Sequence, residues 1–320
     1  MKVVVTDITF KDYEIERKIF EEMGVEFVVA DCKSTADLVE VAHDADALLN
    51  AAFQLTEERI KLLPNVKVIC RYGIGVDTID VKAATERGIY VANVQDYCHD
   101  EVADHALSLI LTMGRKIIPL HEGLKKNVRS TVFDQTPIRR IKTQTVGLIS
   151  FGNIARNLAR KLKAIGYNVI AFDPYCTEEI AKEYGVELLP LEALMKRSDV
   201  ISVHAPLTKS TRHLINAEML SLVRKDAFIV NTGRGPVIDQ TALIEALQNK
   251  TIAGAALDVF EVEPLSADSP LLDMEQVIVT PHAAFYSDES SAEMKQKAAE
   301  NIKLVLDGDV PRYLINKEIL

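Results

Sequence analysis

Two series of short, continuously apolar runs, rich in β-branched residues, constrain the fold of this chain most strongly. The first series consists of KVVVTD, VEFVVADC, DALLNA, VKVICRYG and GIYVANV, and the second of QTVGLISFG, YNVIAFDPY, SDVISVHAP, KDAFIVNTG, TIAGAALDVF and EQVIVTPHA. Polar stretches with helical spacing separate the runs. Strands that are apolar at every position are covered on both faces, so the pattern predicts an α/β fold with two doubly wound parallel sheets.

The chain is long enough, at 320 residues, for two medium-sized domains. Between the two series, the periodicity predicts a helix over residues 100–118 with Asp100 as its N-cap. The segment after about residue 290 predicts one amphipathic helix that ends at Gly308. Each series of apolar runs therefore predicts one domain, with the helix at 100–118 between them.

Charge and cysteine content exclude several classes of function. The 37 basic and 47 acidic residues give a net charge of -10, which repels nucleic acid and anionic membrane surfaces. No apolar stretch reaches the roughly 18 residues of a membrane span, and no secretory signal is recognisable. Cys32, Cys70, Cys98 and Cys176 lack the paired spacing of a zinc site. We expect a soluble cytoplasmic protein with reduced thiols and no bound metal.

The stretch VGLISFGNIAR predicts a dinucleotide-binding loop between a strand and a helix. Such loops carry three glycines, whereas here Ser150 holds the first position, Gly152 the second and Ala155 the third. A serine at the first position costs roughly 1–2 kcal/mol if the backbone there needs a positive φ. Phosphate affinity comes mainly from backbone N–H groups and the helix dipole, so the loop is still expected to bind a pyrophosphate.

Asp173 follows the next strand, in VIAFDPY, about 20 residues after the loop. A carboxylate at this position accepts hydrogen bonds from the adenosine ribose and repels a 2′-phosphate. This residue therefore predicts NAD rather than NADP as the cofactor. The alternative interpretation is an aspartate that caps the following turn before Pro174.

Three charged or titratable side chains follow predicted strands in the second series. Arg234 lies in NTGRG, Glu263 ends ALDVFEVEP, and His282 lies in VIVTPHAAFYS. Doubly wound sheets bind ligands at the carboxyl ends of their strands. Hydride transfer needs a proton shuttle and a group that orients the substrate carbonyl, which this set can supply. Each residue alone also fits a structural role, as a loop ion pair, an exposed carboxylate or a core histidine.

Nearly the whole chain resembles the D-isomer-specific 2-hydroxyacid dehydrogenase family. The segments that carry the resemblance are RYGIGVDTID, EVADHALSLIL, VGLISFGNIAR, DPY, HAPLT, NTGRGPVID, GAALDVFEVEP and TPHAAFYS, in family order and spacing. The resemblance implies a flavodoxin-like substrate domain formed by residues 1–98 and 289–320, and an inserted Rossmann NAD-binding domain formed by residues 99–288. It also implies that Arg234, Glu263 and His282 are the catalytic arginine, acid and histidine, with His282 as the proton donor to the ketone oxygen.

The resemblance further implies contacts for the cofactor and substrate. The backbones of Asn153 and Ile154, beside Gly152, are expected at the pyrophosphate. The residues expected along the rest of the cofactor are Ala205 near adenosine, Thr232 and Gly233 near the nicotinamide ribose, and Asp258 at the carboxamide. Tyr72 and Gly73 are expected to donate backbone N–H groups to the substrate carboxylate.

The substrate class follows from what the sequence lacks. Phosphoglycerate dehydrogenases of this family carry an arginine in the segment that matches LLNAAFQLT, whereas Asn50, Ala51 and Ala52 stand here. The resemblance therefore implies a small non-phosphorylated 2-hydroxy or 2-oxo acid as substrate, with phosphoglycerate as an alternative. Formate dehydrogenases pair the histidine with glutamine, which Glu263 argues against.

A function of another class stays open. NTGRG, GAALDV and TPHAAFYS also resemble the C-terminal-binding-protein corepressors, NAD(H)-sensing dimers of the same fold that have tryptophan in place of Phe285. The same three catalytic residues occur in those proteins, so they do not discriminate. In either case the resemblance implies a homodimer, formed through the helix at 100–118 and the following segment LHEGLKKNVRS.

Overall fold

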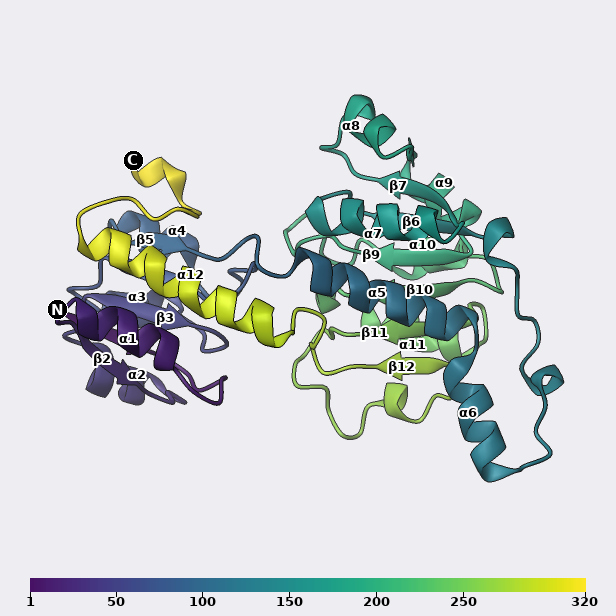
Figure 1. Cartoon of the computed structure of the whole chain (residues 1–320), viewed down its shortest axis with the longest axis horizontal. Helices are drawn as coiled ribbons and strands as arrows, with labels where there is room; N and C mark the ends of the chain where they lie inside the picture. The colour runs from purple at the N-terminus through teal and green to yellow at the C-terminus, as the bar shows by residue number, and fades with distance from the viewer. The chain divides into compact units, whose positions relative to one another are not determined.

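The computed structural model describes all 320 residues and divides the chain into two compact units. Unit 1 comprises Met1–Tyr97 and Ser287–Leu320, and unit 2 comprises Cys98–Tyr286. Each unit is built on a parallel sheet with helices packed on it, as Figure 1 shows. The predicted α/β class with two parallel sheets is confirmed. No helix is both long and apolar enough to cross a membrane.

Unit 1 contains a five-stranded sheet in the order β2-β1-β3-β4-β5. Its strands are β1 (Lys2–Val5), β2 (Glu26–Val29), β3 (Ala47–Asn50), β4 (Val68–Arg71) and β5 (Tyr90–Ala92). Its helices are α1 (Glu14–Glu22), α2 (Thr35–Ala42), α3 (Glu57–Lys61), α4 (Val81–Glu86), α12 (Asp288–Leu306) and the 3-10 turn η5 (Lys317–Ile319). This strand order is that of flavodoxin-like sheets, whose direction of winding changes between β1 and β3.

Both faces of the unit 1 sheet are covered, which explains its continuously apolar strands. One face packs Val4, Leu48 and Ile69 into a core with α2, α3 and α4. Helices α1 and α12 pack against each other on the other face (Figure 1). Because α12 comes from the C-terminal end of the chain, the unit is closed by two segments that are distant in sequence.

Unit 2 contains a seven-stranded parallel sheet in the order β12-β11-β10-β9-β6-β7-β8. Its strands are β6 (Thr145–Ile149), β7 (Asn168–Phe172), β8 (Glu187–Leu188), β9 (Val200–Val203), β10 (Phe228–Asn231), β11 (Gly254–Leu257) and β12 (Val277–Val279). Its helices are α5 (His99–Gly114), α6 (Ile117–Lys126), α7 (Asn153–Ala164), α8 (Glu178–Glu183), α9 (Leu191–Arg197), α10 (Ala217–Ser221) and α11 (Gln240–Gln248). Its 3-10 turns are η1 (Val132–Gln135), η2 (Ile141–Thr143), η3 (Gly235–Val237) and η4 (Pro270–Leu272). The order is that of a Rossmann sheet, with the change of direction between β6 and β9.

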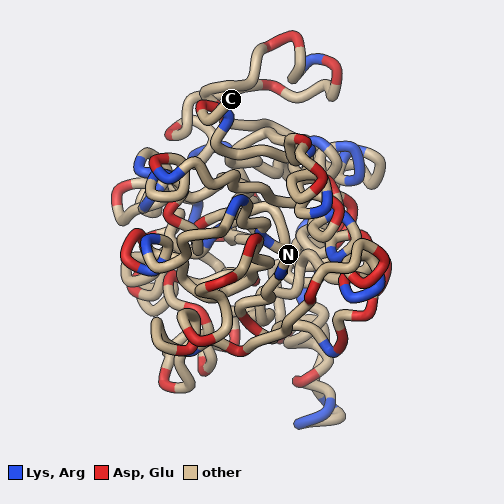
Figure 2. The backbone as a smooth tube through the Cα atoms, turned by 90° about the vertical axis from the view of Figure 1, so that its left-hand side faces the viewer, with Lys and Arg blue, Asp and Glu red and all other residues tan.

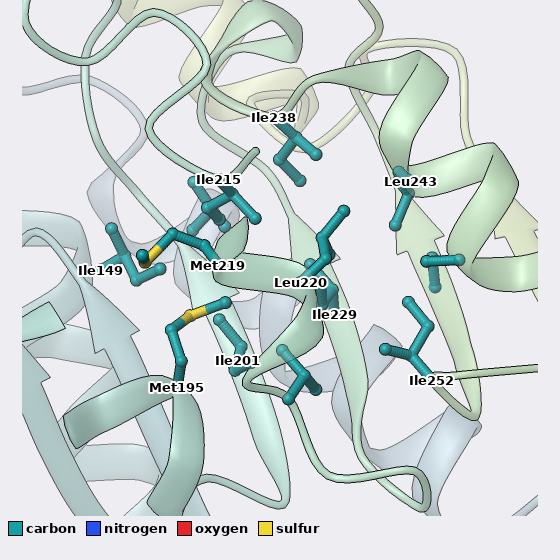
Figure 3. Packing of buried hydrophobic residues seen from close by; sticks show 14 of the residues in the cluster. Ile149, Met195, Ile201, Ile215, Met219, Leu220, Ile229, Ile238, Leu243 and Ile252 are labelled. Atoms are coloured by element: carbon teal, nitrogen blue, oxygen red, sulfur yellow. The ribbon is translucent and has the colours of Figure 1, made fainter. Parts of the chain in front are cut away.

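Two apolar layers hold the unit 2 sheet between its helices. One layer joins α5 and α7 to one face of the sheet. The other joins α9, α10 and α11 to the opposite face, where Met195, Met219 and Leu243 meet Ile201 and Ile229 from the strands (Figure 3). Burial of this kind stabilises a fold by roughly 1.5–3 kcal/mol per large apolar side chain. The two buried layers therefore hold the sheet in place and fix the starting points of the loops at its carboxyl edge.

Two details of the predicted helix at 100–118 are wrong. The helix stops at Gly114, because Lys116 adopts a left-handed conformation with φ 55°, and α6 begins at Ile117 as a separate helix. The N-cap is Cys98 rather than Asp100. The Asp100 carboxylate lies in the first turn, where it accepts hydrogen bonds from Asn157 (2.6 Å) and Lys161 (3.2 Å) of α7. The predicted C-terminal helix is present as α12, and Gly308 follows it with φ 95°.

Candidate active site

The three predicted catalytic residues lie at one edge of the unit 2 sheet. Arg234 follows β10, Glu263 follows β11 and His282 follows β12, and these strands are neighbours. Because the strands are parallel, their carboxyl ends meet at the same edge. The sheet thus gathers side chains from segments that are 48 residues apart along the chain, between positions 234 and 282.

Glu263 and His282 form a hydrogen-bonded pair. Oε2 of Glu263 lies 2.6 Å from Nδ1 of His282, and Oε1 accepts a hydrogen bond from the Phe260 N–H (3.0 Å). Burial alone would raise the pKa of Glu263, but the hydrogen bond and charge of His282, the Phe260 N–H and the charge of Arg234 outweigh it and lower that pKa. An ionised Glu263 assigns the Nδ1 proton to the imidazole and leaves Nε2 to face a reactant.

The backbone at His282 is strained and firmly held. His282 adopts φ 51°, and its N–H donates to the Asp258 carbonyl (2.8 Å). The buried Asp258 carboxylate accepts hydrogen bonds from the N–H groups of Ala283 (2.8 Å) and Ala284 (2.9 Å) and from the Thr280 hydroxyl (2.5 Å). Asp258 therefore fixes the loop that carries the imidazole. Non-glycine residues with positive φ are concentrated at functional sites, where neighbouring contacts hold the strain.

Sequence reasoning assigned Asp258 to the cofactor alone and missed its support of the His282 loop. It also missed His105 of α5, whose Nε2 lies 3.1 Å from the Thr280 hydroxyl oxygen. The one sequence signal for His105 was its position next to the apolar residues Ala106 and Leu109 of the helix. Its partner is 175 positions away in sequence, so only the fold identifies the contact.

A tight turn presents Arg234. The buried side chain of Asn231 accepts a hydrogen bond from the Gly233 N–H (3.0 Å) and donates one to the Arg234 carbonyl (3.1 Å). The guanidinium in turn donates to the Gly233 carbonyl (2.9 Å). A Cβ at Gly233 would lie 3.1 Å from the Ala205 carbonyl oxygen, so this turn and the end of β9 approach closely. The planar guanidinium of this half-buried arginine suits a planar anionic group.

The predicted dinucleotide loop follows β6 and opens α7. Ser150 adopts φ 72°, so this serine does carry the backbone strain that a glycine would avoid. Its hydroxyl donates to the Asp173 carboxylate (3.3 Å), which also accepts from the Phe151 N–H (2.7 Å) and the Tyr175 N–H (2.8 Å). Asp173 therefore fastens the loop to the end of β7 and caps its own turn as well.

The N-terminus of α7 has the features of a phosphate site. No side chain caps it, so the first N–H groups of the helix, near Gly152, Asn153 and Ile154, stay free of intrahelical partners. Nothing lies within 4 Å of the position that a Cβ would occupy on Gly152. A helix N-terminus with open backbone donors binds anions. The residues present therefore fit the pyrophosphate of a dinucleotide.

Two further positions along this edge fit a bound cofactor. Ala205 is buried just after β9. Thr232 is 8% exposed, and its hydroxyl has no hydrogen-bond partner within the chain. A buried hydroxyl without a partner is costly unless a ligand or water satisfies it. No group of three or more His, Cys, Asp or Glu side chains is placed to hold a metal ion.

The predicted substrate residues Tyr72 and Gly73 lie in unit 1, at the carboxyl end of β4. The prediction for Tyr72 is wrong, because its N–H donates to the Asn50 carbonyl (2.8 Å) and extends the pairing of β3 with β4. Gly73, with φ 114°, uses its N–H in no hydrogen bond within the chain. Sequence reasoning missed Arg71, whose guanidinium folds over Gly73 and donates to the Tyr72 carbonyl. The sequence signal for Arg71 was its position at the carboxyl end of a predicted strand, where doubly wound sheets bind ligands.

Comparison with known proteins identifies similar proteins among the D-2-hydroxyacid dehydrogenases. Residues 107–284 match the family model for the NAD binding domain of D-isomer specific 2-hydroxyacid dehydrogenases. A glyoxylate reductase of Korarchaeum cryptofilum (strain OPF8) is 36% identical over 286 residues, which cover 88% of this chain and 86% of the relative. A D-3-phosphoglycerate dehydrogenase of Methanocaldococcus jannaschii is 40% identical over 320 residues, 99% of this chain but 59% of the relative. The crystal structure of a D-lactate dehydrogenase from Aquifex aeolicus, complexed with NAD and lactic acid, has a TM-score of 0.87 at 29% identity and covers 96% of each chain.

Proposed function

Because the chain belongs to the D-isomer-specific 2-hydroxyacid dehydrogenase family, we propose that it transfers a hydride between NAD(H) and a small, non-phosphorylated D-2-hydroxy acid or the matching 2-oxo acid. The observation that carries the proposal is the 2.6 Å contact between Glu263 and His282, at the sheet edge that also presents Arg234. This set matches the two requirements of the reaction, a proton shuttle and a carbonyl-orienting cation.

The three side chains divide the chemistry between them. NADH, when bound, supplies the hydride that the carbonyl carbon receives. Arg234 binds the substrate carboxylate and the carbonyl oxygen through its planar, permanently charged fork. His282 gives a proton from Nε2 to that oxygen as the alcohol forms, and takes it back during oxidation. Glu263 holds the Nδ1 proton and stabilises the imidazolium.

We assign cofactor binding to the carboxyl edge of unit 2. The N–H groups at Gly152, Asn153 and Ile154 face the pyrophosphate. Asp173 accepts hydrogen bonds from the adenosine ribose, which favours NAD over NADP. The remaining assignments are Ala205 at adenosine, Thr232 and Gly233 at the nicotinamide ribose, and Asp258 at the carboxamide. In unit 1, the free N–H of Gly73 is the proposed donor to the substrate carboxylate.

A phosphorylated 2-hydroxy acid is the second candidate substrate, because of the 40% identity to a D-3-phosphoglycerate dehydrogenase. Against it, no cation stands at Asn50, Ala51 or Ala52. Oxidation of NADH, followed by its absorbance, tests both candidates with glyoxylate, hydroxypyruvate, pyruvate, a branched 2-oxo acid and 3-phosphohydroxypyruvate. We expect turnover of at least one 2-oxo acid that has an uncharged side chain. We also expect a preference for NADH over NADPH.

The same assay separates the enzyme from an NAD(H)-sensing binding protein. A protein that oxidises NADH with none of these acids, yet associates with itself or a partner only when NADH is present, would be a sensor. Turnover with a 2-oxo acid at a rate that falls when His282 is replaced would exclude a purely sensing role.

We also propose that the protein is a homodimer and works in the cytoplasm. Large apolar side chains are exposed along α6 and the segment that follows it, including Ile117, Leu124 and Phe133. Exposed apolar patches of this kind mark interfaces. The four free cysteines fit a reducing compartment. Lys and Arg positions are interspersed with Asp and Glu along the chain (Figure 2), which gives no footprint for a polyanion. Sedimentation of the purified protein tests the dimer.

A further inference from the structure

A second histidine–glutamate pair in unit 2 involves the same loop as the pair of Glu263 and His282. Nε2 of His213 lies 2.5 Å from Oε1 of Glu261, which stands two residues before Glu263. Because a carboxylate accepts hydrogen bonds, the His213 ring is the donor. Both glutamates of this loop are therefore bonded to a histidine, and each histidine comes from a different segment of the chain.

The chain between the two glutamates has little else to hold it. Val262, which lies between them, is 73% exposed, so no apolar burial fixes this part of the loop. Glu261 also exchanges two hydrogen bonds with Gln240, from its N–H to the side-chain oxygen (3.2 Å) and from the Gln240 N–H to Oε1 (3.4 Å). The bond from His213 is the shortest of the three, so it contributes most to the position of Glu261.

The His213 ring projects from a backbone that is fixed to the turn of Arg234. His213 adopts φ 52°, and its N–H donates to the Pro236 carbonyl (2.8 Å), two residues after Arg234. The Ile215 N–H continues this pairing with the Val237 carbonyl (3.1 Å). A strained backbone persists only where neighbouring contacts hold it. The ring therefore starts from a defined point beside the arginine turn.

The arginine turn and the glutamate loop also touch directly. A Cβ on Gly235 would overlap the carbonyl group of Phe260, just before Glu261. This close approach of the two backbones is one point of attachment, and the bond from His213 to Glu261 is a second. Two points of attachment fix the orientation of a loop, whereas one point leaves it free to turn.

We propose that His213 is a positioning residue for proton transfer. Its ring ties Glu261 to the turn that presents Arg234. The tie sets where Glu263 presents its carboxylate to His282. This inference rests on the proposed function, because it takes the proton to be transferred by His282. His213 itself takes no part in the chemistry.

The first test measures the chemical step. In His213→Ala, the single-turnover rate of NADH oxidation at saturating 2-oxo acid should fall about tenfold, because a small misplacement of reacting groups slows a reaction strongly. The half-saturating concentration of the acid and the Kd of NADH should stay within about twofold, because the variant removes no proposed binding contact. His213→Gln keeps an N–H donor and should recover most of the rate. His43→Ala, which removes an exposed histidine of unit 1, is the matched control and should keep the wild-type rate.

A double-mutant cycle tests the route through Glu261. If His213 acts through this carboxylate, the variant with both His213→Ala and Glu261→Ala should lose no more rate than the larger of the two single losses. Losses that multiply would mean that His213 acts by another route, and would overturn the inference. If His213→Ala does not fold, Glu261→Ala removes the same hydrogen bond and should lose at least about tenfold in rate.

A spectroscopic reading needs no turnover. The ring nitrogen resonances of His282, assigned by comparison with His282→Gln, report on its contact with Glu263. At neutral pH they should move in His213→Ala, return toward the wild-type position in His213→Gln, and stay unchanged in His43→Ala. A residue that supports folding alone would lower the stability, and would leave both these resonances and the rate of the folded protein unchanged.

The outcomes separate this inference from the proposed function. A wild-type rate in His213→Ala, or unmoved His282 resonances in that variant, would overturn the role of His213 and leave the dehydrogenase intact. Absence of turnover with every acid in the wild type would overturn the proposed function. The resonances would then still decide whether His213 orders the pair of Glu263 and His282.

Discussion

An aspartate at the carboxyl edge of each sheet binds backbone N–H groups, but it occupies the donors at the crevice in unit 1 and leaves them open in unit 2. In each, an aspartate just after a strand accepts the backbone N–H of a neighbouring loop and the hydroxyl of a nearby residue. In unit 1, Asp7 pairs with Ala51, Ala52 and Thr6, whereas in unit 2, Asp173 pairs with Phe151 and Ser150.

The difference lies in where each aspartate sits relative to the change in winding. Asp7 stands at the crevice between β1 and β3, where the winding changes direction, and its carboxylate occupies the Ala51 and Ala52 N–H groups there. Asp173 stands one strand away from the crevice, at the end of β7, and leaves the N-terminus of α7 open. That edge can take a pyrophosphate. The position of the carboxylate therefore decides whether the backbone donors at the crevice of each sheet are occupied or open.

The largest expected effect on activity comes from Arg234, at the unit 2 edge. Arg234→Gln should lower kcat/KM for the preferred 2-oxo acid by about 10²–10³-fold, because a preorganised donor to the reacting oxygen is lost. Arg234→Lys keeps the charge without the fork and should lose less. Steady-state NADH oxidation measures both. Near wild-type efficiency in Arg234→Gln would move the chemistry away from this edge.

A smaller effect, on cofactor preference, is expected from Asp173, which leaves the N-terminus of α7 open. Asp173→Ala should raise the kcat/KM ratio of NADPH to NADH by about 10–100-fold, since hydrogen bonds to a charged group contribute roughly 1.5–3 kcal/mol. Cofactor titrations at saturating substrate give this ratio, and Asp7→Ala is the control that should leave it unchanged. An unchanged kcat/KM ratio of NADPH to NADH in Asp173→Ala would contradict the proposed contact between Asp173 and the ribose.

The lowered pKa of Glu263 predicts a pH dependence. Because its folded-state pKa lies below the ordinary 4.5, the ionised carboxylate persists at neutral pH and is lost only as the pH falls through that lowered value. Glu263→Gln lacks this charge at every pH, so kcat/KM for reduction should be about tenfold or more below wild type at neutral pH, and the gap should shrink as the pH falls through the lowered pKa of Glu263. Steady-state NADH oxidation at a series of pH values from neutral to acidic measures this ratio. Equal efficiency of the two proteins at neutral pH would remove Glu263 from the proton shuttle.

The smallest effect concerns the strained serine that Asp173 holds. Ser150→Ala keeps the positive φ and loses the hydroxyl contact, so it should destabilise the protein by about 0.5–1.5 kcal/mol. Ser150→Gly loses the same contact but relieves roughly 1–2 kcal/mol of strain. We expect the glycine variant to be the more stable of the two in urea denaturation. The reverse order would mean that the strain at this position is negligible.

The sequence predicted the architecture because buried parallel strands are apolar at every position, a pattern visible without any partner strand. It predicted the pairing of Glu263 with His282 through family resemblance, and the hydrogen bond is present. It could not predict what Asp7 and Asp258 do, since each acts on backbone groups more than 20 residues away in sequence. The error at Tyr72 arose because strand pairing continues one residue beyond β4 and consumes the N–H.

In the proposed mechanism, His282 moves the proton, and the rest of the unit 2 edge binds the cofactor and orients the substrate. The most direct test measures NADH binding by fluorescence titration and 2-oxo acid turnover in the wild type and in His282→Gln. We predict that the variant binds NADH as the wild type does and loses about 10²–10⁴-fold in kcat. Turnover by His282→Gln at the wild-type rate, with NADH binding intact, would contradict it.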